Sequence, residues 1–437
     1  MKLPNDVLYC IGALESAGFQ AYAVGGCVRD ALLGLDPHDY DLCTDAAPEQ
    51  ISHVFENHDL IHNGEKHGTV GVILNKTVYE ITTFRTEGGY TDSRHPDWVK
   101  FVKQVEDDLA RRDFTVNAMA YNPKTGYIDP FGGQKDLQDR VLRAVGVPEM
   151  RFTEDALRIL RGVRFAVRFH LTPEQSTQHA MAALAPLMDK LAKERIFDEL
   201  SRLLPLVDAQ ALLRFAPILV RAIPQLAPCV GFDQKNYHHA YDVFTHTAHV
   251  VENVPQTLSL RFAALLHDIG KPQCFTLDEQ GQGHFLGHAE VSAELADGIL
   301  RNLKAPNVLR ERVVFLVKYH MLPLEPDKKI LRRRLGKYGF DAIEELLALQ
   351  KADMGSKGTG TDAGMYFSEV ESLIDELRQE AACLTVRDLA INGHDLMALG
   401  ITGKAIGTCL DRLLALVQDE VLPNEKESLL NEIRKLR

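Results

Sequence analysis

The residues of this sequence best suited to catalysis lie near the N-terminus, in the run HDYDLCT. Asp39 and Asp41 are separated by one residue, and the Tyr, Leu and Cys around them favour extended structure. Residues i and i+2 of a β-strand point to the same face, so we expect the two carboxylates side by side. Like charges this close repel each other unless a cation holds them, which makes the pair a natural ligand set for Mg²⁺. A surface turn would carry the same two residues, so their neighbours decide the interpretation.

A glycine pair precedes the two aspartates. Gly25 and Gly26 follow the apolar segment AYAV, and Arg29 comes next at the start of a helix-like stretch. Free backbone N–H groups and an arginine at such a turn suit a triphosphate, although a plain tight turn would also use two glycines. Glu80, in the predicted strand YEITTF, is placed either to join the aspartates as a third carboxylate or to form a cross-strand ion pair. The pattern therefore predicts a phosphate loop and a metal dyad facing one ligand.

A second polar group lies further along the chain. Thr153 is predicted to cap a helix that carries Asp155 and Arg158 three residues apart on one face. An ion pair between Asp155 and Arg158 is the simplest role for that spacing. A carboxylate beside a guanidinium also matches cytosine and adenine, which present an amino donor next to a ring-nitrogen acceptor, and opposes uracil and guanine. The spacing of Asp155 and Arg158 leaves both roles open.

A third group mixes histidine with aspartate. His267-Asp268 follows the apolar run RFAALL, and the order H…HD…D, together with two further histidines, resembles the binuclear HD phosphohydrolases. The candidate ligands are His246, His267, Asp268, His288, His320 and Asp353. Imidazole and carboxylate together suit a divalent transition metal such as Mn²⁺ or Ni²⁺, and two nearby metals can promote phosphate-ester hydrolysis. A metal-stabilised but inert domain would carry the same residues. His238, His239 and Asp242 are expected to support the first ligand or to cap a helix.

Several motifs in one order resemble the class II CCA-adding enzymes and their bacterial poly(A) polymerase relatives. They are GGCVRDALLG, DYDL, RRDFTVNAMA, DPFGG, EDALRILRGVRF and, near the C-terminus, LAINGHDLMALGITGKAIG. The resemblance spans the whole chain. It implies attack of a tRNA 3′ hydroxyl on the α-phosphate of CTP or ATP, with no obligate protein partner.

The resemblance also implies roles for single residues. Asp39 and Asp41 would be catalytic and would bind two Mg²⁺ ions, as the pattern itself suggests. Arg112 and Asn117 would lie near the triphosphate or sugar and Asp113 near the ribose, although Arg112 could instead form a structural salt bridge. The EDxxR motif would select the base. The arginines that continue this face would meet the triphosphate or RNA phosphates; they are Arg161, Arg164 and Arg168.

Hydrophobic periodicity predicts an α+β fold: a nucleotidyltransferase head with a small mixed β-sheet, then an all-α neck, an HD-type body and a tail. The expected boundaries are 1–140 for the head, 141–205 for the neck, 206–375 for the metal-binding body and 376–437 for a tRNA-binding tail. We expect a first helix over 5–18, strands TVGVILN and TVYEITTF joined at Asn75-Lys76, and strand structure after the head only near 274–286. In the tail, a short helix beginning at Thr402 or Gly403 would offer N–H groups and Lys404 to RNA, or would be a packing module.

Composition restricts the class of protein. The net charge of −12 argues against bulk electrostatic coating of nucleic acid, so RNA binding is expected to begin at the arginine-rich stretch 140–168. No apolar run could span a membrane, and seven scattered cysteines suit reduced thiols, so a cytoplasmic protein is expected. The alternatives to full CCA addition are a poly(A) polymerase, a CC- or A-adding specialist governed by the segment 85–99, and an HD phosphohydrolase with an RNA-binding head. The short, mixed-charge C-terminus NEKESLLNEIRKLR favours CCA addition over poly(A) synthesis.

Overall fold

The computed structural model describes the chain except for residues 89–97, 238–239, 360–363 and 436–437. The chain forms two compact units. Unit 1 comprises Met1–Val207 with Arg214–Pro224, and unit 2 comprises Asp208–Leu213 with Gln225–Arg437. The only sheet of more than two strands in the described ranges lies in the first part of unit 1, and helices dominate from there on. The predicted α+β class is confirmed.

The head contains a seven-stranded mixed sheet in the order β3-β4-β5-β2-β1-β8-β9. Its strands are β1 (Ala21–Val24), β2 (Asp41–Thr44), β3 (Asp59–Ile61), β4 (Thr69–Leu74), β5 (Thr77–Thr83), β8 (Ala120–Asn122) and β9 (Gly126–Ile128). Strand β2 pairs parallel with β5, and the other neighbours pair antiparallel. Asn75 and Lys76 both have positive φ (49° and 68°), as a two-residue hairpin turn between β4 and β5 requires, so the predicted hairpin is confirmed.

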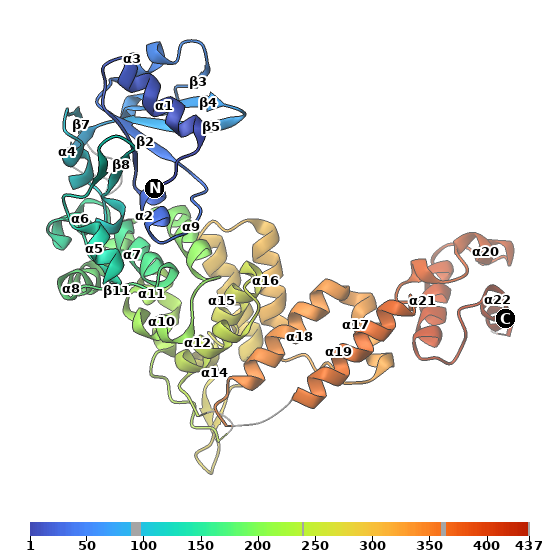
Figure 1. Ribbon diagram of the computed structural model, residues 1–437. Helices are drawn as coiled ribbons and strands as arrows, with labels where there is room; N and C mark the ends of the chain where they lie inside the picture. Colours follow the sequence, from blue (N-terminus) through green and yellow to red (C-terminus); the bar gives the residue numbers. More distant parts are fainter. Residues whose placement is uncertain (89–97, 238–239, 360–363, 436–437) are drawn as a thin grey trace. The chain divides into compact units, whose positions relative to one another are not determined.

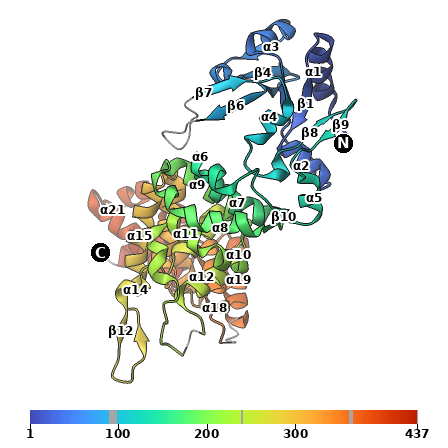
Figure 2. The same cartoon turned by 90° about the vertical axis from the view of Figure 1, so that its left-hand side faces the viewer.

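Helices α1 (Asn5–Ser16) and α3 (Pro48–Val54) pack on this sheet (Figure 1). Helix α1 buries an apolar stripe made of Val7, Cys10, Ile11 and Leu14. It ends two residues before the predicted limit, and Gly18 takes φ 90° just beyond it. On the sheet's other end, β1, β8 and β9 lie side by side (Figure 2). The remaining elements of the head are α2 (Gly26–Leu32), β6 (Arg85–Gly88), β7 (Trp98–Phe101), α4 (Val105–Ala110) and α5 (Gly133–Gln138).

The neck helices complete unit 1, and here one expectation is wrong. Thr153 does not cap a helix: α6 (Pro148–Glu154) already begins at Pro148, whose fixed φ suits the first helical position. The helix stops at Asp155, which is extended (φ −142°, ψ 104°), and α7 (Leu157–Arg168) follows. Asp155 Oδ1 accepts the Leu157 N–H at 3.0 Å, so Asp155 is the capping side chain. The other neck elements are β10 (Val141–Leu142), β11 (Thr172–Pro173), α8 (Gln175–Leu184), α9 (Lys193–Leu203) and α11 (Ala216–Ala222).

Unit 2 is helical, with one small hairpin that extends from it (Figure 2). The hairpin pairs β12 (Thr276–Leu277) with β13 (Gly283–His284), which confirms the strand structure predicted near 274–286. The expectation that the head alone would carry further strands is wrong, because β10 and β11 pair in the neck, which is therefore not wholly helical. From residue 243 to residue 379 the helices of unit 2 are α12 (Val243–Asn253), α13 (Leu258–Leu266), α14 (Lys271–Cys274), α15 (His288–Asn302), α16 (Asn307–Tyr319), α17 (Lys328–Tyr338), α18 (Phe340–Gly355) and α19 (Gly364–Gln379). Helix α10 (Ala209–Arg214) falls at the division between the units.

The end of the chain has a small core of its own. Helices α20 (Gly393–Ala398), α21 (Lys404–Gln418) and α22 (Lys426–Lys435) bury Leu396, Leu413 and Leu429 against one another. Gly403 takes φ 61° immediately before α21, which is 15 residues long and so not the short helix that was expected. All seven cysteines are free thiols. Among the helices of the described ranges, none has the length and apolar character that a membrane span needs.

Candidate active site and metal centre

Asp39 and Asp41 line one cavity of about 570 Å³ in the head. Strand β2 begins only at Asp41, so Asp39 precedes the strand and does not occupy a strand position as expected. Both side chains nevertheless line the cavity, together with Pro4, His38, Tyr40, Thr77, Val78, Tyr79 and Glu80. The structure thus brings together the two carboxylates that the spacing predicted.

The charge balance of this cavity suits a cation. Although Asp41 opens to the cavity, the protein atoms around it displace water and raise the pKa of its carboxyl. Arg112 opposes this change and Asp39 adds to it. A bound divalent cation would relieve both the repulsion and the loss of water, and the hard oxygen ligands match the preference of Mg²⁺. The residues present therefore fit the expected metal.

Glu80 stands next to Asp41 on the neighbouring strand. Leu42 of β2 pairs with Ile81 of β5, which places Glu80 beside Asp41 at the edge of the same cavity. Among the described residues, no cation lies within 4.0 Å of the Glu80 carboxylate, so the alternative of a cross-strand ion pair is not realised there. A role of Glu80 as a third metal ligand stays a prediction.

The glycine pair permits a close approach of Arg112. Gly25 takes φ 77°, and a Cβ atom on it would lie 2.7 Å from Nη1 of Arg112. Its N–H donates to the carbonyl of Met119 at 3.0 Å, and α2 begins at Gly26. Gly25 is therefore required by a neighbouring guanidinium as well as by the turn. Arg112 also contacts Asp108 at 3.3 Å, the salt bridge that was the structural alternative for it.

The other head residues expected at the nucleotide form one hydrogen-bonded chain. Arg29 is buried, donates to Asn117 and Asp30, and its guanidinium lies 4.2 Å from the centre of the Phe169 ring. Asn117 donates to Asp113 Oδ1 at 3.1 Å, and Arg161 donates to Asp113 Oδ2 at 2.7 Å. Burial alone would raise the pKa of Asp113, but Arg161 and the hydrogen bonds lower it to about 2. This chain fixes Asp113 as an anion on the α7 side of the head.

In the neck, the expected pair of Asp155 and Arg158 is not a pair. The Asp155 carboxylate accepts from Nη1 and Nη2 of Arg195 at 3.2 and 2.8 Å. Arg158 is buried and donates to Glu154 at 2.6 Å and to the Arg111 carbonyl at 3.1 Å. The helix break at Asp155 explains this, because the two side chains no longer share a helical face. The prediction of an ion pair between Asp155 and Arg158 is therefore wrong, whereas base recognition by the two residues stays a prediction.

Three partners in this region were missed by sequence reasoning. Arg195 of α9 holds Asp155, Glu154 holds Arg158, and Glu199 holds the buried guanidinium of Arg164 at 2.5 Å. The residues of α9 were assigned no role from the sequence. The spacing in the sequence could have indicated that Glu199 is buried, since it lies on the same helical face as the buried Ile196 and Leu203. Binding of nucleotide by Arg164 stays a prediction, but its guanidinium already has an anionic partner.

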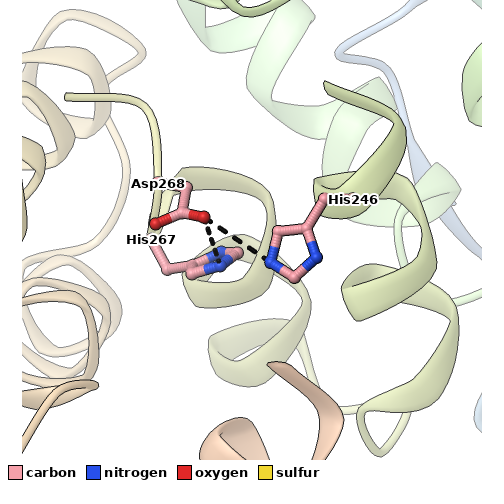
Figure 3. A group of neighbouring side chains, drawn as sticks. All are labelled: His246, His267 and Asp268. Carbon is pink, nitrogen blue, oxygen red and sulfur yellow. Dashed lines mark ion pairs between the residues drawn. The ribbon is translucent and has the colours of Figure 1, made fainter. Parts of the chain in front are cut away.

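Unit 2 brings all six expected metal ligands together. Figure 3 shows His246 from α12, His267 at the end of α13 and Asp268 converging on one point. Asp268 Oδ2 lies 3.5 Å from His246 Nε2 and 3.2 Å from His267 Nε2, and Asp353 of α18 lies 3.0 Å from His246 Nε2. On the other side, Asp268 Oδ1 lies 3.3 Å from His288 Nε2 and 3.9 Å from His320 Nε2.

The hydrogen bonds of the four histidines orient them as ligands. Each Nδ1 lies within hydrogen-bond distance of a backbone carbonyl, at 2.7 to 3.2 Å, and each Nε2 faces Asp268. A carbonyl at Nδ1 favours the tautomer whose Nε2 lone pair is available to a metal. Burial, with His267 nearby, lowers the pKa of His320 to about 4, so that imidazole is neutral. Two ligand groups share Asp268, one with His246 and His267 and one with His288 and His320.

Two supporting residues complete this centre. Lys271, three residues after Asp268, is buried, lies 2.7 Å from Asp268 Oδ2 and donates to Gln234 at 2.9 Å. Burial would raise the pKa of Asp268, but His267 and Lys271 lower it well below its ordinary value. Asp242 caps α12, as one of the alternatives had it. His238 and His239 lie outside the described residues, as does most of the segment 85–99.

The chain matches three protein-family models. Residues 21–143 match the poly A polymerase head domain, residues 170–227 the probable RNA and SrmB-binding site of polymerase A, and residues 236–354 the HD domain.

Full-length relatives agree with these matches. The CCA-adding enzyme of Streptococcus mutans is 34% identical over 99% of this chain and 98% of its own, and that of Streptococcus gordonii is 33% identical over 98% and 97%. The crystal structure of the Bacillus stearothermophilus CCA-adding enzyme in complex with CTP superposes with a TM-score of 0.75 at 29% identity, covering 100% of this chain and 99% of that one. The chain therefore belongs to the family of CCA-adding enzymes, the tRNA nucleotidyltransferases, and carries an HD domain.

Proposed function

We propose that this protein adds C, C and A to the 3′ end of tRNA, taking the nucleotides from CTP and ATP. One observation carries the proposal: Asp39 and Asp41, with Glu80 beside them, line a single cavity that suits a divalent cation. Full-length similarity to CCA-adding enzymes supports the choice of substrates. In this proposal the chemistry belongs to residues 1–140 and base selection to 141–205, while 206–375 and 376–437 form the metal-binding body and the tRNA-binding tail.

In the proposed reaction the RNA 3′ oxygen attacks the α-phosphorus of the nucleotide. A new P–O bond forms there, the bond to the β-phosphate oxygen breaks, and pyrophosphate leaves with its electron pair while the hydroxyl proton passes to solvent. Two Mg²⁺ ions, when bound, would activate the attacking oxygen and hold the triphosphate. Asp39 and Asp41 would hold them, and the guanidinium of Arg112 against Gly25 would stabilise negative charge at the phosphates.

Base choice is assigned to Asp155 and Arg158. The Asp155 carboxylate accepts the amino group of cytosine or adenine, and Arg158 donates to the adjacent ring nitrogen. Uracil and guanine offer the reverse pattern, so they would leave Asp155 facing an acceptor and Arg158 facing a donor. Arg195 and Glu154 act as positioning residues, because each fixes one of the two recognition side chains. Arg29, Asp113, Asn117 and Arg161 hold the wall of the nucleotide site in the same way.

The decisive experiment offers purified protein a tRNA that lacks its last three nucleotides. CTP alone should extend it by two residues, both nucleotides together by three, and UTP or GTP by none. A single A from ATP on a tRNA already ending in CC, with no use of CTP, would identify an A-adding specialist, and extension stopping after CC would identify a CC-adding one. Long A tracts would identify a poly(A) polymerase. No extension under any of these conditions would contradict the proposal.

We infer a second activity for the HD domain, hydrolysis of phosphate esters. The observation that favours it is the arrangement of four histidines whose Nε2 atoms face Asp268. Mn²⁺ or Ni²⁺, when bound, would polarise a phosphate oxygen and supply hydroxide. Hydrolysis of a 2′,3′-cyclic nucleotide by wild-type protein with Mn²⁺ or Ni²⁺ tests this. If no divalent metal supports hydrolysis, the centre is structural. Hydrolysis without any nucleotide addition would favour an HD phosphohydrolase with an RNA-binding head.

A further inference from the structure

The arginines first expected to contact RNA are largely neutralised. Five of the seven arginines between 140 and 168 pair with carboxylates of this chain: Arg143 with Asp136, Arg151 and Arg158 with Glu154, Arg161 with Asp113, and Arg164 with Glu199. Arg140 donates to the carbonyl of Phe169. A protein of net charge −12 needs uncompensated cations somewhere if it is to hold a polyanion. Within the stretch only Arg140 and Arg168 have no carboxylate within 4.0 Å among the described residues, so most of the positive charge that could contact RNA has to be sought elsewhere.

Such cations occur on two neighbouring helices of unit 2. Helix α17 carries six basic residues, and it lies beside α18 and α19 (Figure 1). Three of the six are paired: Lys328 with Glu376, Arg332 with Glu420 and Arg333 with Asp419. Among the described residues no carboxylate lies within 4.0 Å of Arg334 or Lys337 on this helix, or of Lys318 on α16. Together with Lys329, the third unpaired cation of α17, these side chains are the uncompensated charge of the surface.

An aromatic cluster joins α16 and α17 next to two of these cations, Lys318 and Lys337. Phe315, Lys318 and Tyr319 follow one another at i, i+3 and i+4 on α16, and Arg334, Lys337 and Tyr338 repeat that spacing on α17. The three rings touch, with centroids 5.0 Å apart for Phe315–Tyr319, 5.3 Å for Phe315–Tyr338 and 5.2 Å for Tyr319–Tyr338. Lys337 Nζ lies 4.9 Å from the Tyr338 ring, and Lys318 Nζ lies 5.8 Å from the Tyr319 ring.

We define the basic patch as Lys318, Arg334 and Lys337 with Tyr319 and Tyr338, and we propose that it binds phosphates of the tRNA substrate. Lysine and arginine side chains supply the charge-assisted donors that phosphate oxygens accept, and tyrosine hydroxyls add neutral ones. Positive charge interleaved with half-buried tyrosine rings is the composition of RNA-binding surfaces. An acidic protein segment would form ion pairs with the cations but would gain less from contact with the tyrosine rings. This inference rests on the proposed function, since it takes tRNA as the substrate.

The test compares two double variants of the full chain. Arg334→Gln/Lys337→Gln removes two cations of the basic patch, and Arg301→Gln/Lys351→Gln removes two cations that Asp297 and Glu371 already neutralise. Both variants lower the net charge by the same amount. The tyrosines are left intact because Tyr319 precedes His320 of the metal centre. Circular dichroism verifies that both variants are folded.

Affinity for tRNA lacking CCA is then measured at several salt concentrations. Loss of two phosphate contacts should lower the slope of log K against log salt by about two and weaken binding roughly 10- to 100-fold at low salt. The control should match wild type. In the addition assay the patch variant should raise KM for tRNA and leave KM for CTP unchanged.

Three outcomes would overturn the proposal, and the first and third are distinct from failure of the addition activity. The first is a patch variant with the affinity and salt slope of the control while wild type still adds nucleotides. The second is a wild-type protein that does not bind tRNA at all. The third is poly-glutamate binding that the patch substitutions abolish while tRNA binding is unchanged, which would identify an acidic protein partner instead. If wild-type protein adds no nucleotides yet binds tRNA through the basic patch, the proposed function is contradicted and the inference that the patch binds tRNA is supported.

Discussion

Replacement of Asp155 by Asn separates base recognition from helix capping. The carboxylate offers acceptors only, whereas the amide offers one acceptor and one donor. The amide would still accept the Leu157 N–H through its oxygen, so the cap at the start of α7 persists. The ion pair with Arg195 weakens, and because both side chains are partly exposed, its loss should cost about 1 kcal/mol or less. The expected change in stability is therefore small.

The expected change in nucleotide choice is larger. A well-placed polar pair discriminates a base by about 1–3 kcal/mol, which is about a 5- to 150-fold change in relative kcat/KM. Asp155→Asn should therefore lower kcat/KM for CTP and ATP and reduce the preference for CTP over UTP by that factor. The assay is single-nucleotide addition to tRNA with each of the four triphosphates.

A matched control uses another helix cap. Asp327 accepts the N–H groups of Lys329 and Ile330 at the start of α17, so Asp327→Asn makes the same chemical change at a cap in unit 2. It should leave the ranking of nucleotides unchanged. If Asp155→Asn also keeps the wild-type ranking and only loses thermal stability, Asp155 is a cap and nothing more, and the recognition reasoning is refuted.

Three further predictions concern the other sites. Asp39→Ala should abolish addition and leave tRNA binding largely intact, because it removes a metal ligand and no RNA contact; retained activity in this variant and in the Asp41 counterpart would remove the dyad from the mechanism. His267→Ala/Asp268→Ala should eliminate phosphoesterase activity with Mn²⁺ or Ni²⁺ and lower CCA addition by less than about tenfold, a barrier change under about 1.4 kcal/mol; collapse of addition in a folded variant would show that the HD centre serves the transferase. Glu199→Gln should destabilise unit 1 by about 3 kcal/mol because it leaves the Arg164 charge buried and unpaired, and denaturant unfolding should show that Arg164→Met/Glu199→Leu recovers much of the loss.

The HD ligand set shows what sequence order can predict. His267 and Asp268 are adjacent in the chain, and their position after the apolar helix α13 already places them at a buried helix end. The order of the other four ligands predicted one cluster, and the structure gathers them into two groups that share Asp268, with Asp353 beside His246. A site whose residue types have few other uses in that order is predictable, because burying several histidines beside aspartates is costly unless they bind something.

The neck shows why the partners of charged residues could not be predicted in the same way. Spacing within one helix favoured Asp155 with Arg158, but the helix break sends Asp155 to Arg195, 40 residues away, and Arg158 to Glu154. The break depends on where Pro148 starts α6 and on the capping preference of Asp155, a local competition that periodicity does not resolve.

The same difficulty misplaced the expected RNA contact. The number of arginines between 140 and 168 gives the charge of that segment alone. Binding of a polyanion depends on the charge that remains once carboxylates from other parts of the fold have paired with those arginines. Glu199 and Asp113 supply such partners; Glu199 lies on α9, to which the sequence assigned no role, and Asp113 was expected at the ribose. On α17 the ion pairing is incomplete, since three of its six cations have no carboxylate within 4.0 Å among the described residues; they are Lys329, Arg334 and Lys337. The positive charge that remains after ion pairing, and not the number of arginines in a segment, therefore indicates Arg334 and Lys337 as part of the RNA-binding surface.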